Sequence, residues 1–323
     1  HIPETIPALS ESPSLQDVMF VNQSMAAEVL SAQGWSESKN FAFTSEKYEQ
    51  EFLGEVDKLK NLNLTLSNAG SVAAIKLLNP LNEELNRMRV SLSAGLFKNV
   101  IYNFHQGNLS GRLFEIGECF ALKDSADYHQ QWNLGLMAWG RPMGLWSATD
   151  ELGAAKKNQI VAPLVYELKS TMDVFLQKMK IKGFQWLAVT DRSQVPSYIH
   201  RGQCLFLKVA GKTVGYIGAL HPVLVDQEKL RVDVVVAEFN FEMLMQTKSN
   251  AVKIKTPSKM PKMIRDLALV MPKSLRSNDV EKEIRTQAGG NLMGLQVFDV
   301  FEPSAEISGG LEKGQKSVAY RLV

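Results

Sequence analysis

The chain has 323 residues, 45% of them hydrophobic and 22% charged, and a formal net charge of +2. This is the composition of an ordinary globular protein, long enough for two or three domains, and no apolar run approaches the roughly 20 residues of a membrane-spanning helix. The two cysteines, Cys119 and Cys204, lie far apart, and the five histidines form no metal-ligand spacing with them. We therefore expect a cytoplasmic protein without a structural zinc.

The first part of the chain predicts a linker and then a folded body. Residues 1–14 are rich in Pro and Ser, as in a connector within a longer protein. Residues 15–246 combine helical periodicity with alternating strands, which predicts an antiparallel sheet flanked by helices. The β-branched residues of 232–241 predict a central strand. The predicted elements are helix 15–34, strand 40–44, helix 46–62, a strand or short helix at 72–78, a turn at 79–82, helix 85–104, strands 112–122 and 134–140, helix 164–180, strand 185–191, a hairpin at 204–222 with its turn at Ala210-Gly211-Lys212, and strand 232–241.

A second linker, residues 247–262, is predicted to join this body to a smaller domain at 263–323. The order of elements in that domain is strand, helix, strand, strand, which is how a ferredoxin-like α+β sandwich begins. Its predicted elements are strand 263–270, helix 277–290, and strands 292–303 and 312–323.

The small domain carries the positive charge of the chain. Residues 250–323 hold 12 Lys/Arg and 8 Asp/Glu, whereas residues 1–249 hold 24 and 26. A basic domain on a slightly acidic body favours a polyanionic partner. An open sheet with a few polar and aromatic residues suits an RNA loop better than it suits chemistry.

Motifs for nucleotide chemistry are lacking. In the glycine-rich residues 309–317, Gln315 stands where a phosphate-binding loop needs lysine, so we expect a loop between two strands. No G-x-G-x-x-G indicates a dinucleotide site, and Ser91, Ser93 and His105 lack the G-x-S-x-G of a hydrolase. The arginines of the body have no acidic metal triad beside them, as ATP chemistry would need.

Two other features of the body have an ordinary structural interpretation. Glu115 lies in a predicted strand, and we expect it on the solvated or interface side of the sheet rather than on a substrate. Trp132, Trp139 and Trp146 repeat at seven-residue spacing. We expect them to pack the body or a subunit interface.

A series of motifs runs through the chain in a fixed order. It consists of NPLNEELNRMRVSLSAGLFKNVIYNFHQG followed by RLFEIGECF (79–120), YELKSTMDVFL (166–176), IHRGQ (199–203), VGYIGALHP (214–222), RDLALV (265–270) and FDVFEP…GQKS (298–317). In sequence and order these motifs resemble the β-subunit family of bacterial phenylalanine–tRNA ligases. The resemblance covers nearly the whole chain and corresponds to the C-terminal portion of that subunit.

The resemblance implies an α+β chain of two domains. Residues 15–246 would be a class II aminoacyl-tRNA synthetase-like core without catalytic residues, and residues 263–323 a truncated ferredoxin-fold anticodon-binding domain. The family's enzyme attaches phenylalanine to its tRNA with ATP and magnesium, typically as an α2β2 heterotetramer whose α subunit holds the aminoacylation site. We thus expect a chain that docks the α subunit, contacts tRNA(Phe), binds no cofactor or metal itself and lacks the editing activity of the family's upstream domains.

The resemblance also implies anticodon-binding residues. The family's base-contacting positions match Asp299, Phe301 and Ser317. An aromatic ring can stack on an unpaired base, and the two polar groups suit base edges. Because neighbouring strand residues face opposite sides, we expect Phe298 to face away from Asp299 and Phe301. The cations expected to contact phosphates are Lys313, Lys316 and Arg321.

Departures from the family leave alternatives open. The family usually has Tyr at the position of Phe301, and SYIHRGQ (197–203) replaces a commoner Leu-His-Pro-Gly-Gln run. The chain can also be interpreted as a self-sufficient enzyme with a class II-like core. A third interpretation is a stand-alone protein-interaction module with a synthetase-like core and no role with tRNA.

Overall fold

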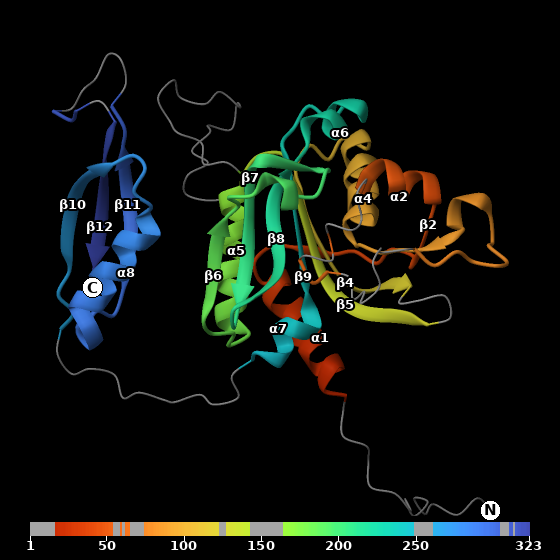
Figure 1. Cartoon of the computed structure of the whole chain (residues 1–323), viewed down its shortest axis with the longest axis horizontal. Helices are drawn as coiled ribbons and strands as arrows, with labels where there is room; N and C mark the ends of the chain where they lie inside the picture. The colour runs from red at the N-terminus through yellow and green to blue at the C-terminus, as the bar shows by residue number, and fades with distance from the viewer. Residues whose placement is uncertain are drawn as a thin grey trace, which may run out of the picture. The chain divides into compact units, whose positions relative to one another are not determined.

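The computed structural model forms two compact units, residues 1–252 and 253–323, each built on its own β-sheet (Figure 1). This arrangement is the α+β fold class expected from the sequence. Within the part of the chain that is described, no helix combines the length and the apolar character needed to cross a membrane. The structure describes residues 17–53, 59, 62–64, 74–122, 127–142, 164–248, 261–303, 310–312 and 314–323.

The larger unit is organised by a sheet that has seven strands among the described residues. Every neighbouring pair is antiparallel except the pair β1–β4, which is parallel. Strand β9 occupies the central position predicted for 232–241, and all its residues are buried, as its β-branched run favours. From edge to edge the strands are β1 (Ser36–Glu37), β4 (Gly111–Leu122), β5 (Tyr128–Trp139), β9 (Val234–Asn240), β8 (Lys212–Leu220), β7 (Ile199–Val209) and β6 (Phe184–Ala188).

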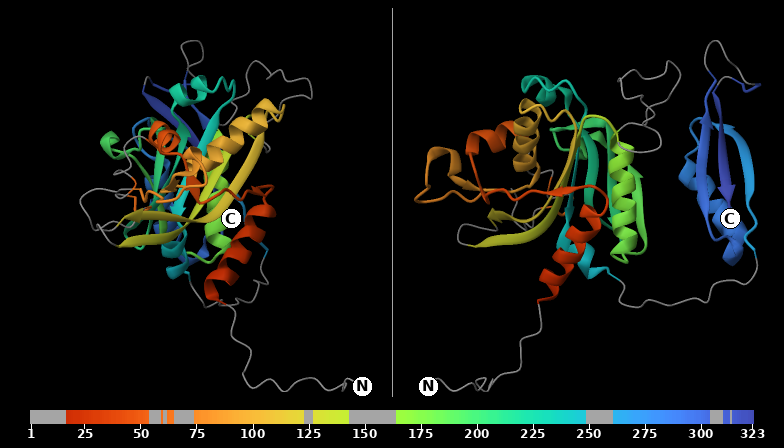
Figure 2. Two further views of the ribbon diagram at one scale, coloured as in Figure 1. Left: turned by 90° about the vertical axis from the view of Figure 1, so that its right-hand side faces the viewer. Right: turned by 180° about the vertical axis from the view of Figure 1, so that it is seen from behind.

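Helices cover both faces of this sheet, as the views in Figure 2 show. One apolar core lies between the sheet and helices α1 (Val18–Ser31), α5 (Leu164–Lys178) and α7 (Phe241–Gln246). A second core lies on the other face, under α2 (Glu46–Leu53) and α4 (Ser93–His105). The shorter elements are β2 (Phe43–Thr44), β3 (Arg87–Met88), α6 (Pro222–Gln227) and the 3-10 turns η1 (Glu83–Leu85) and η2 (Arg192–Gln194).

Most predicted elements of the body are present, and the differences have local causes. The helix predicted at 85–104 is wrong in its first half, because Arg87–Met88 pairs with β2 and helix α4 begins only at Ser93. Strand β5 begins at Tyr128, earlier than predicted, because its pairing with β4 continues to Leu122. The hairpin turn lies where predicted, with Ala210 and Gly211 both at positive φ.

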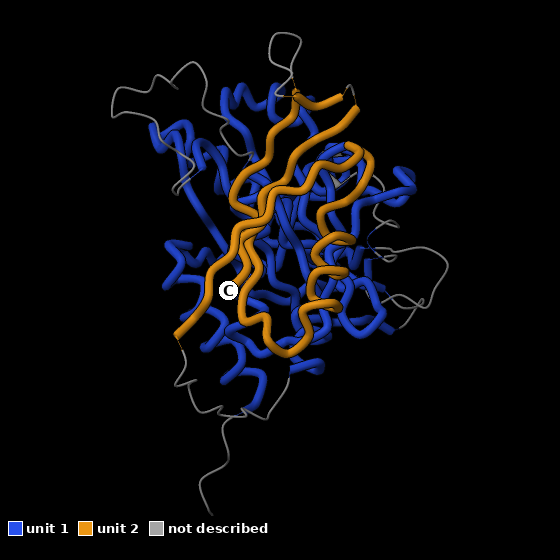
Figure 3. Tube along the Cα trace, turned by 90° about the vertical axis from the view of Figure 1, so that its left-hand side faces the viewer, with its two compact units in different colours: residues 1–252 blue, residues 253–323 orange. Residues whose placement is uncertain are grey.

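Among its described residues, the smaller unit has a three-stranded sheet with one helix (Figure 3). Strand β12 lies between β10 and β11 and is antiparallel to both, so β10, α8 and β11 form a split β-α-β unit. This is the ferredoxin-like order expected from the sequence. Its core is formed by Met271, Val318 and Tyr320. The elements are β10 (Arg265–Pro272), α8 (Ser277–Ala288), η3 (Gly289–Asn291), β11 (Leu295–Phe301) and β12 (Gln315–Leu322).

Helix α2 of the larger unit carries a buried carboxyl group. Glu49 is 4% exposed, and one of its oxygens accepts a hydrogen bond of 2.9 Å from the Val90 backbone N–H. Burial raises the pKa of Glu49 to about 7, against the smaller opposing effects of the Val90 hydrogen bond and the Arg87 charge. The folded pKa therefore lies above that of the unfolded chain, so ionisation of Glu49 weakens the fold as the pH rises through 7.

We expect Glu49→Gln to stabilise the chain above pH 8 by about 1–3 kcal/mol and to have little effect near pH 4.5. A glutamine oxygen still accepts the Val90 hydrogen bond and removes the cost of the buried charge. The measurement is denaturant unfolding of both proteins from pH 4.5 to pH 8.5, with Glu28→Gln on the exposed side of α1 as the matched control. A difference in stability that stays constant over this range would contradict the prediction.

Candidate nucleic-acid interface

The small sheet has one face against helix α8 and one face away from it. In β12, Val318 and Tyr320 are buried, and the Tyr320 hydroxyl lies 3.1 Å from the hydroxyl of Ser277 in the first turn of α8. Because successive strand residues alternate, Ser317 and Arg321 belong to the other face. We call this other face the open face.

The three predicted base-contacting residues meet on the open face. Directly opposed residues of an antiparallel pair share a face, and Phe301 is paired with Ser317 while Asp299 is paired with Ala319. Asp299 is exposed, whereas Phe301 and Ser317 are half-buried. An aromatic ring, a carboxyl group and a hydroxyl group therefore lie together on one sheet surface, with Asp299 and Phe301 on the same side as expected.

The expectation that Phe298 faces away from Asp299 is wrong. The register of β11 shifts between Val297, paired with Tyr320, and Asp299, paired with Ala319. Phe298 is the extra residue of this β-bulge, and a bulge interrupts the strict alternation of faces. The Arg321 guanidinium lies 4.9 Å from the centre of the Phe298 ring, which places the ring on the open face. Nothing in the local sequence identifies the bulge.

Arg321 is held by an ion pair across the open face. Its Nε and Nη2 donate to the two carboxylate oxygens of Asp266 on β10, each at 2.8 Å. These hydrogen bonds hold the pKa of Asp266 below its usual range and raise the pKa of Arg321. The guanidinium expected to contact phosphate thus bridges a carboxylate and an aromatic ring, in a row that runs Asp266, Arg321, Phe298.

The two predicted lysines do not join this row. Lys316 pairs with the buried Met271, which places it on the helix-covered face, and its Nζ donates to the Lys273 carbonyl at 3.2 Å. Lys313 lies outside the described residues. The binding roles of both lysines, like those of Asp299, Phe301 and Ser317, stay predictions.

The larger unit contains a buried polar cluster beneath helix α4. The side chain of Glu238 has no exposed surface and accepts hydrogen bonds from the hydroxyls of Ser91 and Ser93, at 2.5 and 2.7 Å. The same carboxyl group accepts from the Asn133 amide at 2.9 Å. Ser93 opens α4 and His105 ends it, so the helix separates them by about 18 Å and no Ser–His pair forms.

Glu115 belongs to a second buried pair, and the expectation that it faces solvent or an interface is wrong. Its side chain is 2% exposed and lies 2.6 Å from the Arg89 guanidinium. The Asn40 amide donates to its other oxygen at 2.7 Å. Gly117 makes room for this pair, because a Cβ there would lie 2.2 Å from Arg89 Nη2. These polar groups bond one another rather than line an open site.

The tryptophan stripe is divided between the two cores. Trp132 packs against the core under α1 and α5, and Trp139 is buried in the core under α4. Trp146 lies outside the described residues. The two described tryptophans therefore pack the body, as the sequence indicated.

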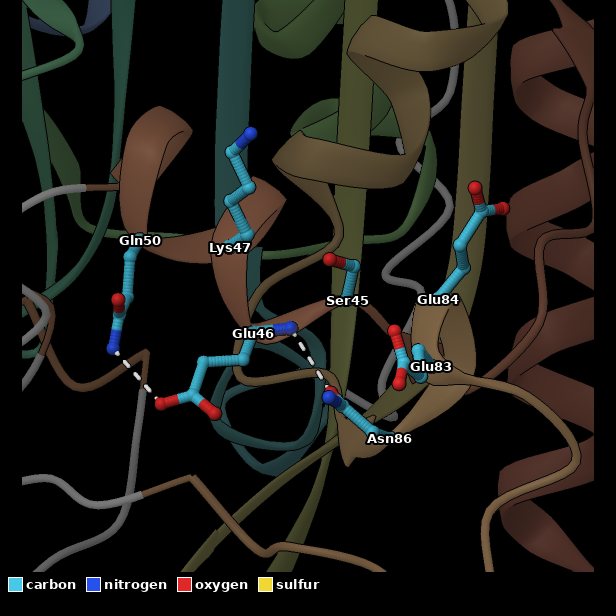
Figure 4. A pocket seen from close by; sticks show the side chains of 7 residues that line it. All are labelled: Ser45, Glu46, Lys47, Gln50, Glu83, Glu84 and Asn86. Carbon is cyan, nitrogen blue, oxygen red and sulfur yellow. Dashed lines mark hydrogen bonds between the residues drawn. The ribbon is translucent and has the colours of Figure 1, made fainter.

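A surface depression of about 810 Å³ lies at the start of α2 (Figure 4). The Asn86 side chain there accepts a hydrogen bond from the Glu46 backbone N–H at 3.0 Å. Three of its lining residues are glutamates and one is lysine, a balance that disfavours phosphate groups. The lining residues are Ser45, Glu46, Lys47, Gln50, Glu83, Glu84 and Asn86. Among the described residues, no group of three or more His, Cys, Asp and Glu is placed to hold a metal ion.

Comparisons with known proteins give a consistent result. The family model "Phenylalanyl tRNA synthetase beta chain CLM domain" matches residues 2–241, and "Ferredoxin-fold anticodon binding domain" matches residues 258–323. The phenylalanine–tRNA ligase β subunit of Bdellovibrio bacteriovorus is 40% identical over the whole chain, which spans 37% of that relative's length. The β subunit of Coxiella burnetii is 34% identical over 78% of the chain, which corresponds to 29% of its length.

The fold also has a likeness among solved structures. A pyrrolysyl-tRNA synthetase of Desulfitobacterium hafniense superposes with a TM-score of 0.47 and 14% sequence identity. The superposition covers 71% of this chain and 68% of that one.

We expect Arg89→Met to destabilise the chain by about 3–5 kcal/mol, because it leaves the buried Glu115 without its counter-charge. Adding Glu115→Gln to that variant should recover much of the loss, since a glutamine oxygen still accepts from Asn40 and carries no charge. The measurement is the free energy of unfolding of the single and double variants at neutral pH. Equal losses in both variants would mean that shape, and not charge pairing, determines the role of Arg89.

Proposed function

The chain belongs to the family of phenylalanine–tRNA ligase β subunits, and from that premise we propose that it supports the ATP-dependent attachment of phenylalanine to its tRNA. In this proposal, residues 15–246 dock the catalytic α subunit and residues 263–323 contact the anticodon of tRNA(Phe). The observation that carries the proposal is the open face of the small sheet, where Asp299, Phe301 and Ser317 lie together.

The chemistry of the open face suits an unpaired loop. The half-buried ring of Phe301 offers a stacking surface, and stacking on an aromatic side chain stabilises an RNA base by about 1–3 kcal/mol. The Asp299 carboxyl group accepts hydrogen bonds from base N–H groups, and the Ser317 hydroxyl both donates and accepts. This combination of a ring with polar groups is how sheets read the edges of splayed bases.

The interior of the larger unit supports a docking role over a catalytic one. The buried carboxylates that face α4 from the sheet have protein partners, since Glu238 accepts from Ser91 and Ser93 and Glu115 pairs with Arg89. An ATP site needs cations that are free to neutralise phosphate charge. In the proposed α2β2 assembly, which would act in the cytoplasm, the α subunit supplies the ATP- and magnesium-dependent chemistry.

We expect Phe301→Ala to weaken binding of a tRNA(Phe) anticodon stem-loop by about 1–3 kcal/mol, roughly 5- to 150-fold in Kd. The substitution removes the stacking surface and leaves the strand pairing in place. Fluorescence anisotropy with the 323-residue chain measures the affinity. The control is Tyr166→Ala, which removes an aromatic ring from helix α5 in the larger unit. Unchanged affinity of the Phe301 variant would remove the stacking role, and a strong salt dependence of binding would argue against a pure protein-interaction module.

We expect the chain alone to catalyse no phenylalanine-dependent ATP–pyrophosphate exchange and to co-purify with a coexpressed α subunit. The measurements are exchange of labelled pyrophosphate into ATP and affinity capture from the coexpression lysate. The whole α2β2 enzyme serves as the positive control for exchange. Exchange by the isolated chain would instead identify a self-sufficient enzyme.

A further inference from the structure

The open face carries a second aromatic ring, that of Phe298, which the proposed function above does not use. We propose that Phe298 is a second base-stacking position, so that the small sheet takes two unpaired bases of one RNA loop, one on Phe301 and one on Phe298. This inference rests on the proposed anticodon contact and adds to it a residue that simple alternation from Asp299 would place on the helix-covered face.

The β-bulge brings Asp299 and Phe301 to the same face as Phe298. Ordinary alternation from Val297, which packs in the core of the small unit, would send Asp299 to the core as well. The register shift instead pairs Asp299 with Ala319 on the open face and leaves Phe298 unpaired between Val297 and Asp299. The bulge therefore leaves three residues, Phe298, Asp299 and Phe301, on one surface within a stretch of four positions.

A cation supports the Phe298 ring from one side. The Arg321 guanidinium lies 4.9 Å from the ring centre, within the range of a cation–π contact. The guanidinium is itself fixed by its two 2.8 Å hydrogen bonds to the Asp266 carboxylate. Phe298 is half-buried, so the ring is supported by the protein and still has surface for a ligand. Asp266 and Arg321 are thus positioning residues, and Arg321 contributes no unpaired charge.

The spacing of the two rings determines the kind of ligand. Three residues along a strand span about 10 Å. Two neighbouring bases that stack on each other lie about 3.4 Å apart along a strand of nucleic acid, so such a pair cannot place one base flat on each ring. Two splayed bases can, and splayed bases on sheet aromatics are characteristic of single-stranded RNA recognition.

The test measures binding of a tRNA(Phe) anticodon stem-loop to the 323-residue chain by fluorescence anisotropy at fixed salt. We expect Phe298→Leu to raise Kd by about 5- to 100-fold, because leucine keeps the bulk but not the flat ring. Phe298→Tyr keeps the ring and should bind within about threefold of the parent chain. Val300→Leu, in the same strand but on the helix-covered side, is the matched control and should bind like the parent.

The Asp266→Asn variant separates stacking from simple electrostatics. The substitution frees the Arg321 charge and adds one net positive charge to the chain. If the ion pair serves to position Phe298, affinity for the stem-loop should fall relative to a stem-loop with a scrambled anticodon. If Arg321 contacts phosphate instead, affinity for both RNAs should rise together, and the positioning role is overturned.

The outcomes distinguish this inference from the function on which it rests. Loss of affinity in Phe301→Leu with none in Phe298→Leu would overturn the second stacking position and leave the anticodon contact standing. Full affinity in both variants would overturn the anticodon contact itself, and the inference with it. Circular dichroism and thermal melting of each variant establish that the small unit is folded.

A second measurement uses the parent chain and does not depend on any variant folding. Stem-loops with 2-aminopurine at each of the three anticodon positions report by fluorescence when that base changes its stacking on binding. Two responding positions are expected, one for each ring. A response at one position only would overturn the second stacking site.

Discussion

The larger unit depends on the buried carboxyl group of Glu238 at the centre of its sheet. This group lies on β9 with no exposed surface and accepts hydrogen bonds from Ser91, Ser93, Asn133 and the Leu92 backbone N–H. A buried polar group left without partners costs about 1–3 kcal/mol, and a charged one costs more. The turn that starts α4 and the neighbouring strand β5 must therefore both be in place before this carboxyl group is satisfied.

The two units present contrasting surfaces. In the larger unit, both faces of the sheet are covered by helices, and the buried carboxylates under α4 are held by neighbouring side chains. In the smaller unit, the described residues place one helix on one face of the sheet, and the other face presents Asp299, Phe301 and Arg321. A sheet covered on both faces suits a partner surface on the outside of its helices, whereas an open sheet face suits a ligand that lies flat on it. The division of roles in the proposed function follows from this difference.

The open face is shaped by contacts that join all three strands of the small sheet. Asp266 on β10 holds Arg321 on β12, and Arg321 lies against Phe298 on β11. The β-bulge at Phe298 brings Asp299 and Phe301 to the same face as this row. Geometry of this kind fixes aromatic side chains before any ligand arrives, which reduces the conformational entropy that binding would otherwise cost.

The sequence by itself determined the two-domain α+β organisation, the central position of β9, the hairpin turn at Ala210 and the shared face of Asp299 and Phe301. These features depend on local periodicity and on turn residues, which act within a few positions along the chain. Only the tertiary structure decided that Glu115 is buried against Arg89, that α4 begins at Ser93, and that Phe298 shares the open face with Phe301. Each of these depends on a partner strand or a charge far away in sequence, and periodicity carries no information about such long-range pairings.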